Sequence, residues 1–392
     1  MIKANLKISY LIARSILLVT VWLSLTACQQ TKSDSTADPS DSVERKDTQL
    51  TLNNAVWQQS NQQDNTTWKI RAENAVYGKN KQTAELKNVT GNLLKNGKLI
   101  LQLSAERGEV RDNGNLVLLK DNIVATDPRN GGTISSDVVE WRPTENLLLI
   151  RQNLQGDYAS SYPSDRDNVR VTATEGKYYT NSETLELRDK VVVTTAEPAL
   201  QLTSDRLTWN LSQNIVNSEV PLQIVRYQDN TASDRLVADR GMVDIDNHTV
   251  TLTDNIELIT TDPQLQIATN SLVWNYQSRI INTDKPIQII DRAEGLNVIG
   301  NAGEVDLNRN LAHLKSGSKS NSKSNSAQLY ANELIWNLDT EIVEAIGNIV
   351  YQQNEPRVNV TGNKAEGKLT DNSIVVTGDK KSGQVTSIID NL

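Results

Sequence analysis

The chain has 392 residues, a formal net charge of −8 at pH 7, two histidines and one cysteine. Nucleic-acid binding is disfavoured, because neutralising phosphates takes clustered Lys and Arg and acidic residues outnumber basic ones here. A single cysteine also excludes a disulfide framework. The length suggests two or three domains, but the absence of Phe and the scarcity of helical periodicity beyond the N-terminus favour one extended β protein.

Residues 1–28 have the pattern of an export signal. Lys3, Lys7 and Arg14 precede an apolar run, Ser15–Thr26, which is short for a membrane span of about 20 residues. The next residues, Ala27-Cys28, complete Leu25-Thr26-Ala27-Cys28, which resembles the bacterial lipobox and implies acylation of the Cys28 thiol. The alternative is an uncleaved signal anchor with an incidental cysteine, and either reading tethers the remaining chain to a membrane outside the cytoplasm.

Residues 29–49 form the predicted tether, and residues 50–392 form a single predicted array of strands. The tether is rich in Ser, Asp, Thr and Lys and has too few apolar residues to fold. In the array, apolar and polar residues alternate through Ala238–Ile245 and again through Val250–Leu258. The polar turn Asp246-Asn247-His248 separates the two runs, a pattern that predicts two half-buried strands joined by a tight turn.

The same phrase recurs along the array with a nearly constant period. Equivalent positions are 31 to 37 residues apart, most of them 31. They are Ala75, Gly108, Val139, Gly176, Leu207, Gly241, Leu272, Gly303, Leu334 and Ala365. A fixed period of this size predicts about ten stacked units that cannot bury their apolar faces alone. The predicted fold class is therefore all-β, built from repeats of antiparallel strands.

Alternation within each unit gives one dry face and one wet face. Units of the form Gly-x-Val/Tyr alternate with units of the form Leu/Val-x-Trp. The candidate inward positions, which share the parity of the tryptophans, are Val110, Trp141, Tyr178, Leu207, Trp209, Val243, Leu272, Trp274, Val305, Leu334 and Trp336. Glycine in place of Leu at alternate units predicts close approach of the facing walls.

Two stretches interrupt the pattern. Residues 158–165 lengthen one spacing to 37 and predict a surface loop. Residues 316–326, SGSKSNSKSNS, do not change the spacing. This composition predicts a solvated loop that replaces a strand, with a hinge or an open section in one wall as the alternative.

Catalytic chemistry finds little support in the array. His248 and His313 have no Cys or His at metal-ligand spacing, so no metal and no cofactor is expected. The pair Asp239-Arg240 recurs at the equivalent places in other units and predicts exposed structural charges rather than catalytic groups. An exported carbohydrate-acting enzyme would need paired carboxylates outside the repeat register, and none is evident.

The recurring phrases resemble the β-jellyroll family shared by LptC, LptA and the N-terminal domain of LptD. They occur here as ADRGMVDI with VTLTDNIEL, SAERGEV with LVLLKDNI, and ATEGKYY with LELRDKVVV. The resemblance spans about residues 50–389, at roughly twice the usual length of LptC, and the N-terminal membrane signal points to LptC within the family.

This resemblance implies an open, V-shaped trough of two antiparallel sheets whose inner face holds the acyl chains of lipopolysaccharide. The inward positions given above would line that trough. The implied partners are the inner-membrane LptB/LptF/LptG ABC transporter and an LptA-like or LptD-like jellyroll joined through edge strands. The implied location is the periplasm. For the N-terminal anchor, the inner membrane is favoured over the outer membrane. The alternative from another class is a closed structural or adhesive β-solenoid that binds partners on its outer face.

Overall fold

The computed structural model describes residues 50–62, 65–79, 82–159, 168–196, 199–323, 326–354, 357–368, 373–378 and 385–389. Every described residue belongs to one compact unit, Thr48–Leu392, which is the second unit of the chain. The predicted export signal, Cys28 and the tether lie outside the described residues, as does most of the predicted loop at 158–165.

Regular structure in the described residues is antiparallel strand, apart from two 3-10 turns, η1 (Asp112–Gly114) and η2 (Pro143–Glu145). The first ten strands are β1 (Thr51–Asn61), β2 (Thr66–Tyr77), β3 (Ala84–Lys95), β4 (Lys98–Arg111), β5 (Leu116–Thr126), β6 (Thr133–Arg142), β7 (Leu147–Ala159), β8 (Asn168–Tyr179), β9 (Thr184–Thr195) and β10 (Leu200–Asn210). The next eight are β11 (Ile215–Ser218), β12 (Leu222–Gln228), β13 (Thr231–Ala238), β14 (Arg240–Asp244), β15 (Thr249–Thr260), β16 (Leu265–Asn275), β17 (Ile280–Thr283) and β18 (Ile287–Asp291). The last eight are β19 (Leu296–Asp306), β20 (Leu311–Ser322), β21 (Gln328–Ala331), β22 (Glu333–Asn337), β23 (Val343–Gln353), β24 (Val358–Lys368), β25 (Ser373–Thr377) and β26 (Thr386–Ile389).

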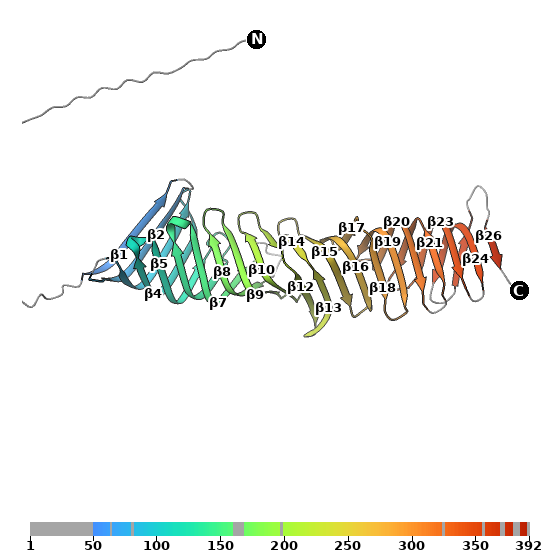
Figure 1. Cartoon of the computed structure of the whole chain (residues 1–392), viewed down its shortest axis with the longest axis horizontal. Helices are drawn as coiled ribbons and strands as arrows, with labels where there is room; N and C mark the ends of the chain where they lie inside the picture. The colour runs from blue at the N-terminus through green and yellow to red at the C-terminus, as the bar shows by residue number, and fades with distance from the viewer. Residues whose placement is uncertain are drawn as a thin grey trace, which may run out of the picture. The chain divides into compact units, whose positions relative to one another are not determined.

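Strands follow one another in chain order along the second unit (Figure 1). From β1 to β10 each strand pairs with its predecessor. Farther along, two short strands often occupy the place of one long strand: β11 and β12 both pair with β10, and β17 and β18 both pair with β16. Two neighbouring long strands make one unit of the repeat, so the all-β antiparallel jellyroll expected from the sequence is confirmed.

A bulge interrupts most strands near the middle and explains the recurring Asp-Asn phrase. Asp254 and Asn255 have φ of 62° and 48°, a left-handed conformation that Asp and Asn tolerate better than most residues. The register of β15 against β16 shifts there, between Thr253 and Ile256. The Asn255 side chain donates to Oδ2 of Asp239, which lies between β13 and β14, at 2.6 Å. This bulge bends the strand and divides it into two halves.

The recurring Asp-Arg and Glu-Arg pairs serve the same corner. Arg240 pairs with Asp254, and Arg107 with Asp121, in exposed ion pairs beside the bulge. At the corner of β5, the Asn122 side chain donates to Glu106 Oε1 at 2.6 Å. Arg240 and Arg107 are exposed, as expected, whereas Asp239 is half-buried where it accepts from Asn255.

The Ser/Lys stretch differs from its prediction. It does not form a loop that replaces a strand, because residues up to Ser322 complete β20 and pair with both β19 and β21. Ser318, Ser320 and Ser322 face inward and are buried, whereas Lys319 between them reaches over the Tyr330 ring, 5.2 Å from its centroid. Backbone ladder bonds and period-2 alternation therefore outweigh the loop-like composition.

Consecutive turns of an antiparallel array lie at opposite strand ends, which defines two lips. The described residues of the turns that follow β1, β3, β5 and β9 form the first lip, and those of the turns that follow β2, β4, β6 and β8 form the second lip. Backbone bonds link successive turns along each lip: Asn96 N donates to Asn65 O on the first lip at 3.0 Å, and Thr180 N donates to Asn146 O on the second at 2.9 Å.

Candidate functional site: an apolar trough and its pocket

Inward-facing side chains form three apolar clusters along the array. The first extends from Ala55 to Leu207, the second from Leu222 to Leu272, and the third from Leu265 to Ala365. The half-buried side chain of Ile281 packs against both the second and the third cluster. The apolar interior therefore continues between these two clusters.

All the inward positions expected from the sequence face this interior. In the first cluster these are Val110, Trp141, Tyr178 and Leu207, with Trp209 packed against it. The second contains Leu272, with Val243 and Trp274 packed against it. In the third they are Val305, Leu334 and Trp336. Their burial follows from the alternation of side chains along each strand.

The tryptophans show that the interior is not equally closed along its length. Trp141 and Trp336 are 4% and 1% exposed, whereas Trp209 and Trp274 are only half-buried. The indole Nε1 atoms of Trp209 and Trp274 nevertheless lie beneath the surface with no hydrogen-bond partner in the protein. The half-buried rings belong to the middle of the array, where the strands are also shorter.

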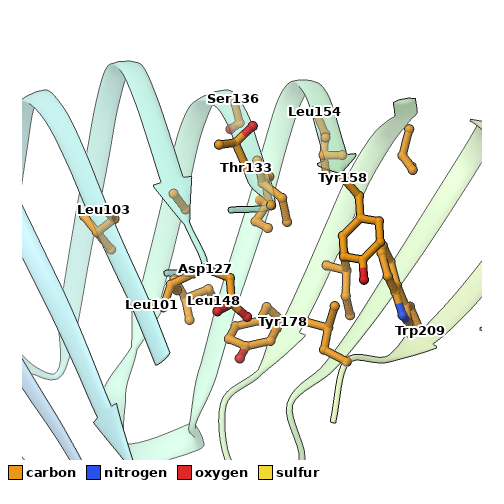
Figure 2. Close-up of a pocket in the computed structure, with 18 of the residues that line it drawn as sticks. Leu101, Leu103, Asp127, Thr133, Ser136, Leu148, Leu154, Tyr158, Tyr178 and Trp209 are labelled. Carbon is orange, nitrogen blue, oxygen red and sulfur yellow. The ribbon is translucent and has the colours of Figure 1, made fainter. Parts of the chain in front are cut away.

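A pocket in the first cluster opens between the two halves of β4 to β10 (Figure 2). Its cavity volume is about 90 Å³, below the about 300–1,000 Å³ of small-molecule sites, so in this structure the pocket is a narrow slot. The apolar residues that line it are Ile100, Leu101, Leu103, Ile123, Ala125, Ile134, Val139, Leu148, Ile150, Leu154, Val171, Leu185, Leu187 and Leu211. Such a lining suits a hydrocarbon chain rather than a polar substrate.

Aromatic rings bridge the two halves at the ends of this region. Trp68 of β2 and Trp141 of β6 have centroids 4.5 Å apart at an interplanar angle of 43°. Tyr158 of β7 meets Trp209 of β10 edge to face at 5.2 Å (Figure 2). In both pairs one ring comes from the half near the first lip and the other from the half near the second lip. The rings therefore join the two walls of the trough.

Polar groups border the pocket along the first lip. Asp127, Asn130 and Gly132, in the turn between β5 and β6, belong to its lining. Asp127 accepts hydrogen bonds from Arg129, whose Nη2 lies 2.6 Å from Asp127 Oδ2. Arg129 also contacts Glu183 of the second lip, with 2.7 Å between Nη1 and Oε2.

Burial perturbs the titratable groups of this border. Burial alone would raise the pKa of Glu183, but hydrogen bonds from Lys95 and Arg129 outweigh it and hold that pKa below its ordinary value. The pKa of Arg129 is raised, chiefly by its hydrogen bond to Asp127. Burial raises the pKa of Tyr178. The border therefore consists of a fixed ionic cluster and a neutral phenol at neutral pH.

Half of the pocket was missed by the sequence patterns. The inward positions chosen from the repeat all lie near the second lip, whereas Ile100, Leu103 and Ile134 belong to the strand halves near the first lip. The sequence signal for these missed residues was the alternation of apolar and polar residues in the other half of each strand, beyond its bulge. The bulge shifts the parity of that alternation, so a single reading frame cannot follow both halves.

The described residues contain no group of three or more His, Cys, Asp or Glu side chains placed to hold a metal ion. Within the same ranges, no helix has the length and apolar character to cross a membrane.

Comparison with known families decides the relationship of the chain. The sequence model described as "Lipopolysaccharide-assembly, LptC-related" matches residues 14–147, 158–226 and 222–323. The chain belongs to the LptC-related family. Three successive matches to one LptC model agree with an array of repeated units, and they include both sides of the pocket apart from residues 148–157.

The chain was also compared with curated proteins and with solved structures. No curated protein matches the chain. Among solved structures, the chain is similar to LptH of Pseudomonas aeruginosa, described as the LptA homologous periplasmic component of the lipopolysaccharide transport device. The identity is 13%, the TM-score is 0.26, and the match covers 30% of this chain and 80% of that one.

Proposed function

We propose that this protein is a membrane-tethered periplasmic carrier that holds lipopolysaccharide by its acyl chains. The observation that carries the proposal is the apolar pocket between the two walls, within a chain of the LptC-related family. Each CH₂ removed from water contributes about 0.8 kcal/mol, so a trough lined by Leu, Ile and Val retains acyl chains without any covalent step. No catalytic residue, metal or cofactor is part of the proposal.

Membership in a lipopolysaccharide-assembly family supports the choice of lipid. In the proposed route the chain receives lipopolysaccharide from the inner-membrane LptB/LptF/LptG transporter, which supplies the energy. It then passes the lipid to an LptA-like or LptD-like jellyroll. Acylation of Cys28 or an uncleaved signal would provide the tether.

The open edges of the array support the handover. In the described residues, β1 pairs with β2 alone, and β25 and β26 pair with β24 alone. Unpaired backbone groups at these two ends can accept a strand from a neighbouring jellyroll. One end would face the transporter and the other the next protein of the bridge.

Photo-crosslinking in cells tests the lipid path. A photoreactive residue replaces Trp209, Trp274 or Trp336, and adducts are detected with an antibody to lipopolysaccharide. We expect adducts at Trp209 and Trp274, because their half-buried side chains border the trough, and a weaker signal at the fully buried Trp336.

Val273 provides a matched control, because it neighbours Trp274 on β16 and is 41% exposed on the outer face. The proposal fails if adducts form at Val273 as readily as at Trp274. Absence of adducts at all three tryptophans would favour the closed solenoid.

A further inference from the structure

Ion pairs join the two lips of the trough at one place along the array, beside the pocket. Lys95 ends β3 on the first lip, and Glu183 lies between β8 and β9 on the second. Lys95 Nζ is 2.8 Å from Glu183 Oε1, and it also donates to the backbone carbonyl of Asn181 at 3.0 Å. These partners are 88 residues apart in the chain. Their contact therefore connects two strand ends that the antiparallel ladder keeps apart.

A second cation of the first lip reaches the same carboxylate. Arg129 Nη1 lies 2.7 Å from Glu183 Oε2. The guanidinium is oriented by Asp127, which accepts from its Nε at 2.9 Å and from its Nη2 at 2.6 Å. One carboxylate of the second lip thus binds two cations of the first, and each carboxylate oxygen has its own partner.

This ionic cluster stands directly at the pocket. Asp127 is one of the lining residues, and so is Tyr178, which lies near the end of β8, just before the turn that contains Glu183. The Glu183 side chain is only 7% exposed, so salt screens its ion pairs less than it screens pairs on an open surface. An acyl chain that enters the pocket sideways must pass between these two lips.

We propose that Glu183, together with Lys95 and Arg129, forms a latch that holds the two lips together over the pocket and opens to admit an acyl chain from the side. The gating part of this inference rests on the proposed function, whereas the latch itself rests on the geometry alone. The latch differs from the backbone bonds between turns, which run along one lip and leave the lips free to separate.

The distance between the lips provides the first test. Spin labels are attached at Asn96 on the first lip and Ser182 on the second, both exposed, in the full chain carrying Cys28→Ser so that no other thiol reacts. Glu183→Gln keeps the size of the side chain and removes its charge. We expect a longer and broader distance distribution in this variant. A control pair of labels at Ser182 and Ser212, which both follow strands that end on the side of the second lip, should show the same distance in the variant and in the parent chain.

Lys95→Met combined with Arg129→Met gives an independent second variant, in which the apolar stems remain and both cations are removed. It should separate the lips as Glu183→Gln does. An unchanged distance between Asn96 and Ser182 in both variants would overturn the latch.

Lipid uptake provides the second test, with fluorescently labelled lipopolysaccharide added to the same proteins. We expect several-fold faster uptake in the two latch variants than in the parent chain. Wider lips with unchanged uptake would overturn the gate. Failure of every protein, the parent included, to take up the probe would overturn both the gate and the proposed function, and the distances would still report whether the lips are latched.

Discussion

Gly176 leaves room for the side chain of Leu154, whose Cδ1 lies 2.6 Å from the position that a Cβ on Gly176 would occupy. The two residues are on neighbouring strands, β8 and β7, and Leu154 lies just beyond the bulge of its strand. The same relationship joins Gly241 to Leu222, with 2.7 Å to Leu222 Cδ2. At these two positions glycine therefore accommodates a leucine at the crease between the two halves.

Gly176→Ala should destabilise the array by overpacking this crease. We expect a loss of about 1–3 kcal/mol, because the added methyl group forces the buried Leu154 side chain to shift from its packed position. Thermal or urea unfolding of the variant and the parent protein measures this loss of stability. Gly156→Ala is the control, since its Cβ would meet only ordinary contacts, the nearest at 3.5 Å. Equal stability of the two variants would show that Leu154 relocates without cost.

Removing the Glu183 charge should destabilise the protein in a pH-dependent way. Lys95 and Arg129 bind Glu183, and the Tyr178 phenol lies within its electrostatic influence. Asp127 contacts Arg129 on its other side. At neutral pH we expect Glu183→Gln to cost about 1–3 kcal/mol. This is less than the about 3–5 kcal/mol for a fully buried pair, because the two cations remain partly in water.

The sign of this pH dependence follows from the lowered pKa of Glu183 in the folded chain. Its ion pairs stabilise the fold fully above the unfolded pKa of about 4.3, and the contribution is lost as pH falls through the lower folded value. The melting temperatures of the parent and Glu183→Gln should therefore differ at pH 7 and converge in acid. A gap that persists unchanged at pH 2 would contradict this account.

Ser320 and Ser318 should respond to truncation with opposite signs. Ser320 is fully buried and its hydroxyl has no partner within the protein, so Ser320→Ala removes a desolvated polar group and should stabilise by about 1 kcal/mol. Ser318 donates to the Ala331 carbonyl at 3.3 Å, so Ser318→Ala should cost about 0.5–1.5 kcal/mol. Urea denaturation midpoints compare the two, and a common sign would refute the assignment.

Proline in β1 should separate edge pairing from folding. Amide N–H groups alternate between the partner strand and the open side along an antiparallel edge strand. Gln58 and Gln59 are both at exposed positions of β1. One of the variants Gln58→Pro and Gln59→Pro should therefore remove a hydrogen bond between β1 and β2 and lower the stability of the protein. The other should leave stability unchanged and reduce crosslinking to the neighbouring jellyroll in cells. Full crosslinking by both variants would exclude β1 as the docking edge.

Period and alternation were enough to predict the strands and the inward tryptophans, because both depend on local geometry that repeats with the sequence. His248 lies in the predicted turn, between β14 and β15, and Trp336 lies inside the third cluster. The Ser/Lys stretch was mispredicted because its composition resembles a loop, whereas the ladder bonds that hold it in β20 come from neighbouring strands.

The sequence by itself determined an antiparallel repeat array with one dry face, since side-chain parity and a recurring unit are written along the chain. Only the tertiary structure decided where the two walls meet. Lys95 and Glu183 are drawn together by the bends at several successive bulges, and Ile100 faces Leu187 across the same pocket for the same reason. Contacts between lips depend on the accumulated geometry of many strands, which no local pattern specifies.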